Sequence, residues 1–281
     1  MKRKLQSIGG SLYLSIPSKW THRYNLDKGS EVNLSFLESG GINISSIELV
    51  EEEKKSVIEY DRFLFRNLMA QYLRGIKIIK IKSKKDFSNT QRDQIISYVG
   101  RLLNLEVIEE TSNEITIHNF KSDIPIKKMI SRMFYLTKGM LSDLTKKDSL
   151  DVIIQRDKLV GKFYLAIIMQ QRELLTKKWD GELTFIEIMD LRLLIQRIEL
   201  IGDEIKHLAK KVLSGSVSIK QEDILFLVDK YDLAFRSYVK QDIESAQLFW
   251  DLEKSDRKKV SHNEHLLKIY DHIKDITDLV I

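Results

Sequence analysis

The C-terminal part of the chain carries apolar residues at the three- and four-residue spacing of a helix face. The clearest case is residues 183–213, where Ile188, Leu191 and Ile195 belong to one stripe. Ser214-Gly215-Ser216 then ends the stretch with turn residues. The pattern predicts a long helix that buries one face in a helical bundle.

The first 50 residues follow a different pattern, with short runs that alternate between apolar and polar residues. Gly9-Gly10 joins the first two runs, which is typical of a β-hairpin. Four short strands are expected, and they bury too little apolar surface to form a stable sheet alone. Residues 1–50 are therefore predicted to form a small β domain that closes its sheet with a second copy, in a homodimer. The expected strands are residues 4–8, 12–16, 31–37 and 42–45.

Residues 56–120 predict a small α/β connector domain between these two parts. Apolar residues at helical spacing run from Ser56 to Arg74, and a β-branched run follows at Ile76–Ile81. A serine at position 88 is a suitable cap for the next helix. The expected order is helix, strand, helix, strand, strand, at residues 56–74, 76–81, 88–103, 105–109 and 114–118.

The helical domain, residues 123–281, contains an internal repeat. Asp148 and Asp157 have the same separation as Asp242 and Asp251, and each copy later carries a pair of acids four residues apart. From the second-helix aspartate to the acid pair, the second copy is shorter by about 22 residues, roughly 16 Å less for each helix of the hairpin. Two three-helix units are therefore expected, at residues 123–215 and 216–281.

The acid pairs are candidate metal ligands. Glu199 and Asp203 lie four residues apart on one predicted helix, as do Asp271 and Asp275 on the last one, so each pair shares a helix face. Carboxylates in this arrangement are suitable for one divalent cation, and sets made only of carboxylates favour magnesium, calcium or manganese. The alternative is a solvated polar stripe. Gly202 lies inside the same helix and indicates the close approach of a neighbouring helix or an ion.

Three segments of the helical domain resemble the three helices of a PhoU repeat. They are RMFYLTKGMLSDL, VIIQRDKLVGKFYLAIIMQQREL and IQRIELIGDEIKHLAKKV. The resemblance implies bound metal at the acid motif of each repeat, iron or zinc in some members, and thus Glu199 with Asp203 and Asp271 with Asp275 as ligands. Where that family has an acid four residues after Asp157, this chain has Gly161.

The segment SIGGSLYLSIPSKWTHRYNLDKGSEVNLSFLESGGINIS resembles the AbrB/MazE module. That module is a dimeric β-barrel of swapped hairpins which binds DNA in its family. Lys2, Arg3 and Lys4 form a basic patch that is suitable for contact with DNA phosphates. The domain either contacts DNA or only dimerises. Archaeal proteins that combine both patterns carry a similar connector, to which the run NLEVIEET corresponds.

Composition narrows these expectations further. The 281 residues are 43% hydrophobic and 31% charged, as in a globular protein. The chain has no cysteine and no apolar run of membrane-spanning length, so we expect a cytoplasmic protein without a membrane span. The net charge of +5 permits DNA as a partner without requiring it. We find no phosphate-binding glycine loop, nucleophile elbow or zinc-protease helix, and we therefore expect no enzymatic activity.

Together the two resemblances imply a multidomain α+β regulator. It would control phosphate uptake or phosphate-responsive gene expression through a protein partner, such as a phosphate transporter or regulatory protein, and through DNA. Its cofactor would be iron, zinc, magnesium or manganese. The alternative is a DNA-binding transcription factor or antitoxin-like module, in which the helices only sense or assemble.

Overall fold

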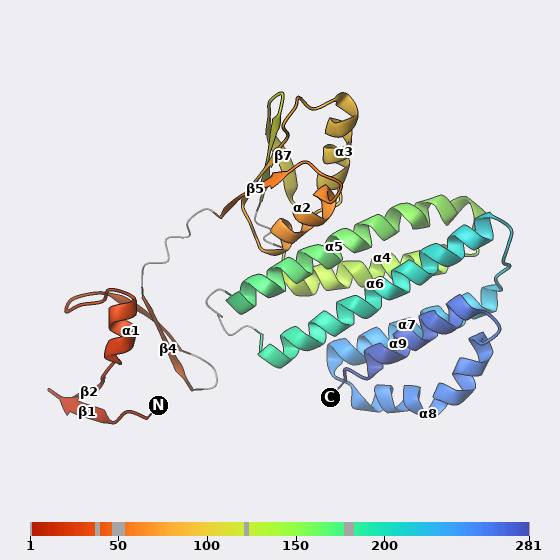
Figure 1. Ribbon diagram of the computed structural model, residues 1–281. Helices are drawn as coiled ribbons and strands as arrows, with labels where there is room; N and C mark the ends of the chain where they lie inside the picture. The colour runs from red at the N-terminus through yellow and green to blue at the C-terminus, as the bar shows by residue number, and fades with distance from the viewer. Residues whose placement is uncertain (1, 37–39, 47–53, 121–123, 177–182, 281) are drawn as a thin grey trace. The chain divides into compact units, whose positions relative to one another are not determined.

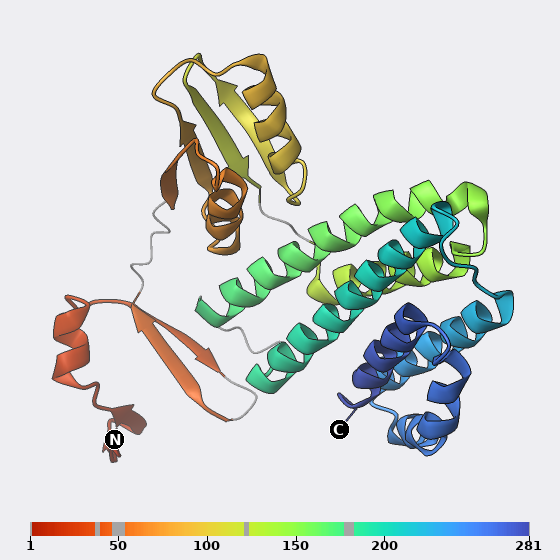
Figure 2. The ribbon, with the colours of Figure 1, turned by 45° about the vertical axis from the view of Figure 1, so that its right-hand side comes forward.

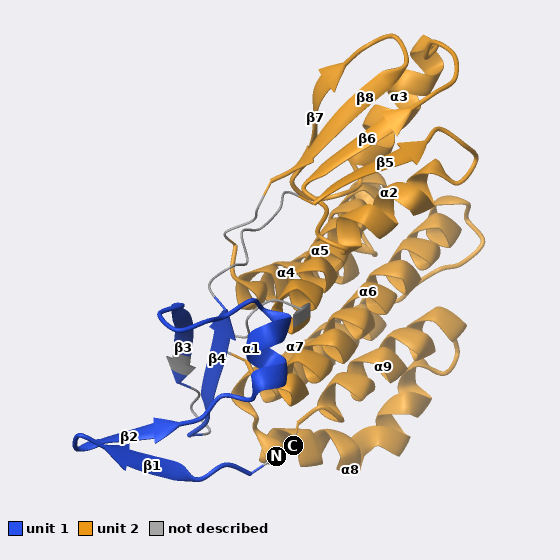
Figure 3. Ribbon diagram, turned by 60° about the vertical axis from the view of Figure 1, so that its left-hand side comes forward, with its two compact units in different colours: residues 1–52, 180–182 blue, residues 53–179, 183–281 orange. Residues whose placement is uncertain are grey.

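The computed structural model describes residues 2–36, 40–46, 54–120, 124–176 and 183–280. The chain divides into two compact units, which are coloured separately in Figure 3. One unit is Met1–Glu52 with Asp180–Glu182, and the other is Glu53–Trp179 with Leu183–Ile281. Each unit is described by itself.

The N-terminal unit contains two separate antiparallel hairpins and a short helix. Gly9 and Gly10 have φ values of 58° and 83°, as the tight turn of the first hairpin requires. The expected strands are confirmed, but one chain does not form a closed barrel, which stays a prediction for a dimer. The elements are β1 (Leu5–Ile8), β2 (Ser11–Leu14), α1 (Ser18–Arg23), β3 (Val32–Phe36) and β4 (Ile42–Ser46).

The second unit begins with a four-stranded sheet and two helices (Figure 1). The strand order is β5-β6-β8-β7, with β5 parallel to β6 and the other neighbours antiparallel. The elements are β5 (Lys55–Glu59), α2 (Leu64–Leu73), β6 (Ile78–Lys82), α3 (Asn89–Val99), β7 (Leu105–Glu110) and β8 (Glu114–Asn119). Ser88 caps α3 through a hydrogen bond from the Gln91 N–H, as expected.

The predicted helix over residues 56–74 is wrong in its first part, because Lys55–Glu59 is the strand β5. Ile58 is 8% exposed and pairs with Ile81 of β6, whereas Val57 is 55% exposed. This alternation is that of a strand at the edge of a sheet. The second part of the predicted helix is correct, because α2 begins at Leu64.

The α/β part packs against the helices that follow. Its core includes Leu68, Tyr72, Ile79 and Ile117, and Met169 of the helical part belongs to the same cluster. The Asn119 side chain of β8 donates to the Met169 sulfur at 3.5 Å. The α/β part and the helical bundle therefore share an apolar contact within one unit.

The rest of this unit is a bundle of two three-helix groups (Figure 2). α5 and α6 have 27 and 29 residues, whereas α8 and α9 have 18 and 14, so the expected shorter second hairpin is confirmed. The first group is α4 (Ile126–Asp143), α5 (Leu150–Thr176) and α6 (Phe185–Leu213). The second is α7 (Gln221–Lys240), α8 (Ile243–Val260) and α9 (Glu264–Thr277).

Buried contacts join the two groups. The hydroxyls of Thr137 on α4 and Tyr231 on α7 lie 2.8 Å apart, and both residues are fully buried. Gly202 of α6 lies against α4 and α5, because a Cβ there would meet Thr137 Cγ2 at 3.4 Å and Val160 Cγ1 at 3.6 Å. The glycine thus marks a close helix approach, one of the two reasons expected from the sequence.

None of the helices in the described ranges is both long enough and apolar enough to span a membrane.

Candidate functional site

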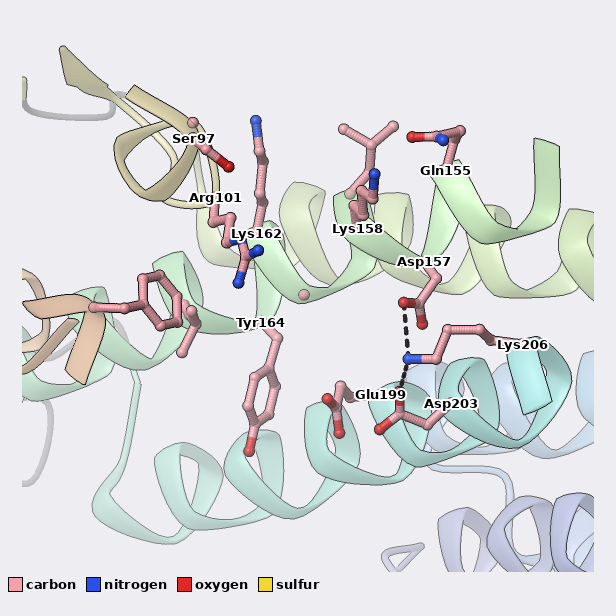
Figure 4. Close-up of a pocket in the computed structure, with 15 residues that line it drawn as sticks. Ser97, Arg101, Gln155, Asp157, Lys158, Lys162, Tyr164, Glu199, Asp203 and Lys206 are labelled. Atoms are coloured by element: carbon pink, nitrogen blue, oxygen red, sulfur yellow. Dashed lines mark hydrogen bonds and ion pairs between the residues drawn. The ribbon is translucent and has the colours of Figure 1, made fainter. Parts of the chain in front are cut away.

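A groove of about 790 Å³ lies where α5 and α6 meet the α/β part (Figure 4). Helices α5 and α6 form most of its wall, and residues of α2 and of the end of α3 complete it. Its volume is typical of small-molecule sites. The groove holds charged side chains of both signs, which makes it the strongest candidate site among the described residues.

Acidic side chains converge at one end of the groove. Glu199 and Asp203 come from α6, and Asp157 comes from α5 (Figure 4). The Lys206 ammonium lies between two of them: it donates to Asp157 Oδ2 at 2.9 Å and also to Asp203. The first predicted acid pair therefore gains a third carboxylate and a lysine, neither of which the sequence identified as a site residue.

The packing of these groups shifts their protonation equilibria. Burial, followed by repulsion from Asp203 and Asp157, raises the pKa of Glu199 to about 7. Burial also raises the pKa of Asp157, although Lys206 opposes this shift. Burial disfavours the charged form of Lys206, but its hydrogen bonds to Asp203 and Asp157 raise its pKa overall. Near neutral pH the cluster therefore carries a partly protonated carboxyl group at Glu199.

The interval between Asp148 and Asp157 is the sequence feature that could have identified Asp157 as a site residue. Asp157 lies nine residues after Asp148, and Asp251 follows Asp242 at the same interval. The sequence does not show which way α5 is rotated against α6, so it does not show that Asp157 faces the first acid pair. Lys206 follows Asp203 by three residues, which places both on one helix face.

The second predicted acid pair lies in a different environment. Arg257 binds Asp271 through two hydrogen bonds, of 2.9 and 3.0 Å, and Arg197 of α6 forms an ion pair with Asp275 at 3.2 Å. Each carboxylate is therefore neutralised by its own arginine.

Metal binding at either acid pair stays a prediction. Across the described ranges, no group of three or more His, Cys, Asp or Glu side chains has the arrangement needed to hold one metal ion. At the first pair, the Lys206 ammonium stands where a cation would bridge Asp157 and Asp203. At the second pair, two acids face two arginines and leave no excess of negative charge. Both pairs therefore contact cationic side chains of the chain itself, Lys206 at the first pair and two arginines at the second.

The proposed DNA-contacting residues lie in the N-terminal unit. Lys2, Arg3 and Lys4 precede β1 and are exposed to solvent. Contact with DNA stays a prediction for them.

Comparisons with known proteins give one structural likeness. No family model matches the sequence, and no curated protein is significantly similar to it. Among solved structures, PhoU from Pseudomonas aeruginosa is similar with a TM-score of 0.47 and 13% sequence identity, over 56% of this chain and 93% of that one. We therefore infer the function from the chemistry of the side chains.

Proposed function

We propose that this chain is a regulatory binding protein that responds to phosphate status. Its helical part would sense a small ligand or metal ion in the groove, and its N-terminal unit would act on DNA as a homodimer. The observation that carries this proposal is the groove, where Asp157, Glu199 and Asp203 converge from two helices. The sequence resemblances to a PhoU repeat and to an AbrB/MazE module support the two roles.

The acidic end of the groove is the part of the proposal that concerns a metal. Three carboxylates face one lysine there, so negative charge is in excess and the donors are oxygens, which hard divalent cations such as Mg²⁺ and Mn²⁺ prefer. A cation bound there would supply positive charge in place of the Lys206 ammonium. Glu199 and Asp203, the pair predicted from the sequence, are the residues that would hold it.

Metal content tests this part. Asp203→Asn removes one ligand from the cluster, whereas Asp275→Asn changes an acid that Arg197 already neutralises. We expect purified wild-type protein to retain a metal that Asp203→Asn has lost. Equal metal content in the wild type and in the Asp203→Asn, Asp275→Asn double variant would show that neither pair binds a metal. Both pairs would then be solvated or ion-paired surface groups.

The N-terminal unit exposes many apolar side chains on its strands. All residues of β1 and β2 are exposed, and apolar side chains such as Leu12 and Phe36 are 69% and 79% exposed. Exposed apolar surface of this kind is typical of an interface. It supports pairing of this unit with a second copy, as the AbrB/MazE resemblance implies.

A DNA-binding factor in which the helices only assemble is the second candidate. The same N-terminal surface favours it equally, but that alternative gives no role to the half-buried acids of the groove. Binding of DNA without any response to ligands of the groove would favour this alternative.

A further inference from the structure

The end of the groove opposite the acids holds an exposed arginine that stacks on two aromatic rings. Arg101 follows α3, and its guanidinium lies over the rings of Phe65 and Tyr98, with 5.2 and 5.5 Å to the ring centroids. These two rings also contact each other, at 5.1 Å between centroids. Stacking occupies the faces of the guanidinium and leaves the N–H donors at its edge available.

The N–H donors of Arg101 are available to an anion. Within the described ranges, no carboxylate pairs with Arg101. Arg101 is exposed to solvent, and it lines the groove at this end (Figure 4). An arginine that stacks on two rings and has no carboxylate partner keeps N–H donors that can bind an oxyanion.

Two lysines of α5 add positive charge to the same groove. Lys158 and Lys162 lie four residues apart, so they share one helix face, and both line the groove. Like charges at this spacing destabilise an isolated helix. Neither lysine pairs with a carboxylate among the residues that the structure describes. A bound anion would remove the repulsion between them.

Gly161 also lines the groove, next to Lys162 in the sequence. It lies inside α5, where a glycine weakens a helix relative to alanine. At Gly202 a neighbouring helix explains the glycine, but a Cβ at Gly161 would meet nothing within 4 Å. Packing within the chain therefore gives no reason for Gly161, whereas any larger residue would project into the groove.

We propose that this end of the groove binds the phosphate group of a small ligand, over Gly161 and between Arg101 and Lys162. The tetrahedral oxyanion suits the combined donors of a guanidinium and an ammonium. In the metal-free protein, the carboxylates of Asp157 and Glu199 orient the ligand, because they repel a phosphate and can accept hydrogen bonds from hydroxyl or amino groups on the rest of the ligand. The inference deepens the proposed sensing function by naming the ligand chemistry.

Two sources share this chemistry, inorganic phosphate and a phosphate monoester, and binding assays separate them. Inorganic phosphate, glucose 6-phosphate and adenosine monophosphate are titrated into the full chain by calorimetry, at constant ionic strength and in metal-free buffer. Arg101→Gln removes the guanidinium, and Gly161→Leu places a side chain in the groove while improving helix propensity. Arg74→Gln is the matched control, because Arg74 is an exposed arginine of the same α/β part outside the groove.

We expect at least one probe to bind the wild type and the Arg74→Gln variant equally. Arg101→Gln should weaken binding by at least about tenfold, the usual effect of losing a charge-assisted hydrogen bond. Gly161→Leu should abolish binding although it melts no lower than the wild type. A response to inorganic phosphate alone identifies the free ion, and a response to an ester alone identifies a metabolite.

The proposal is overturned if no probe binds at millimolar concentration, or if the Arg101→Gln and Gly161→Leu variants bind as the wild type does. Its failure is distinct from that of the proposed function. If the probes fail but metal content still differs between the wild type and Asp203→Asn, the oxyanion site is wrong and the metal-sensing proposal stands.

Discussion

At the scale of single residues, the surroundings of the Glu199 carboxyl group change its pKa strongly. It is half-buried on α6, beside Asp203 and Asp157. Burial and this repulsion raise its pKa from 4.5 to about 7. Between these two values the folded protein binds more protons than the unfolded chain, so the free energy of unfolding falls as the pH rises through this window.

Glu199→Gln removes this dependence, since an amide carries no charge. In metal-free buffer at pH 8 we expect the variant to be more stable than the wild type, by on the order of 1 kcal/mol after allowance for solvent screening. Near pH 4 the two proteins should be close in stability, because Glu199 is then neutral in the folded protein and mostly neutral in the unfolded chain. Urea denaturation at the two pH values provides the measurement.

Glu222→Gln is the control for this experiment, because Glu222 is exposed at the start of α7. Its effect should stay within about 0.5 kcal/mol at both pH values. A Glu199→Gln variant that is less stable than the wild type at pH 8 would contradict the account of the acidic cluster.

At the scale of elements, the long helices follow from the sequence, whereas their rotation does not. The apolar stripe of α6 sets its buried face, and the intervals between aspartates set the shorter second hairpin. The meeting of Asp157 with Asp203 depends on how α5 packs on α6, which no local pattern contains. The sequence predicts a helix where β5 lies, because the alternation of β5 covers only five residues and its parallel partner β6 follows only after α2.

Substitution of two glycines inside helices is expected to change protein stability in opposite directions. Gly202→Leu should destabilise the protein by about 1–3 kcal/mol, because a side chain there has no space beyond its Cβ against Thr137 and Val160. Gly161→Leu should be neutral or stabilise α5 by up to about 1 kcal/mol, because nothing lies near its Cβ. Thermal unfolding of both variants tests the packing of α5 and α6, and equal effects would show that it is wrong.

At the scale of the whole molecule, the sequence patterns assign different roles to the two compact units. The second unit has its own large core, whereas the N-terminal unit exposes apolar residues on both of its hairpins. The sequence predicted strands too few to close a sheet, and the two separate hairpins agree with that expectation. Closure of a barrel depends on a second chain. The sequence of one chain indicates this only because its strands have unpaired edges.

Dimerisation through the N-terminal unit is therefore expected. Replacing Leu12 and Phe36 by serine should convert a dimer into a monomer, since both side chains are exposed in the single chain and would be buried in the pair. The helical circular dichroism should persist, because the helical bundle lies in the other unit. Light scattering of the full-length wild type gives the decisive value, and a monomer would refute the prediction.

We propose that occupation of the groove changes the affinity of the N-terminal unit for DNA. The most direct measurement is the affinity of the full-length protein for a DNA duplex, by fluorescence anisotropy at two salt concentrations, with and without Mn²⁺ and phosphate. We predict an affinity that falls as salt rises, that weakens when Lys2, Arg3 and Lys4 are replaced by glutamine, and that shifts by at least about fivefold with the groove ligands. The same affinity in the presence and absence of those ligands would contradict the claim.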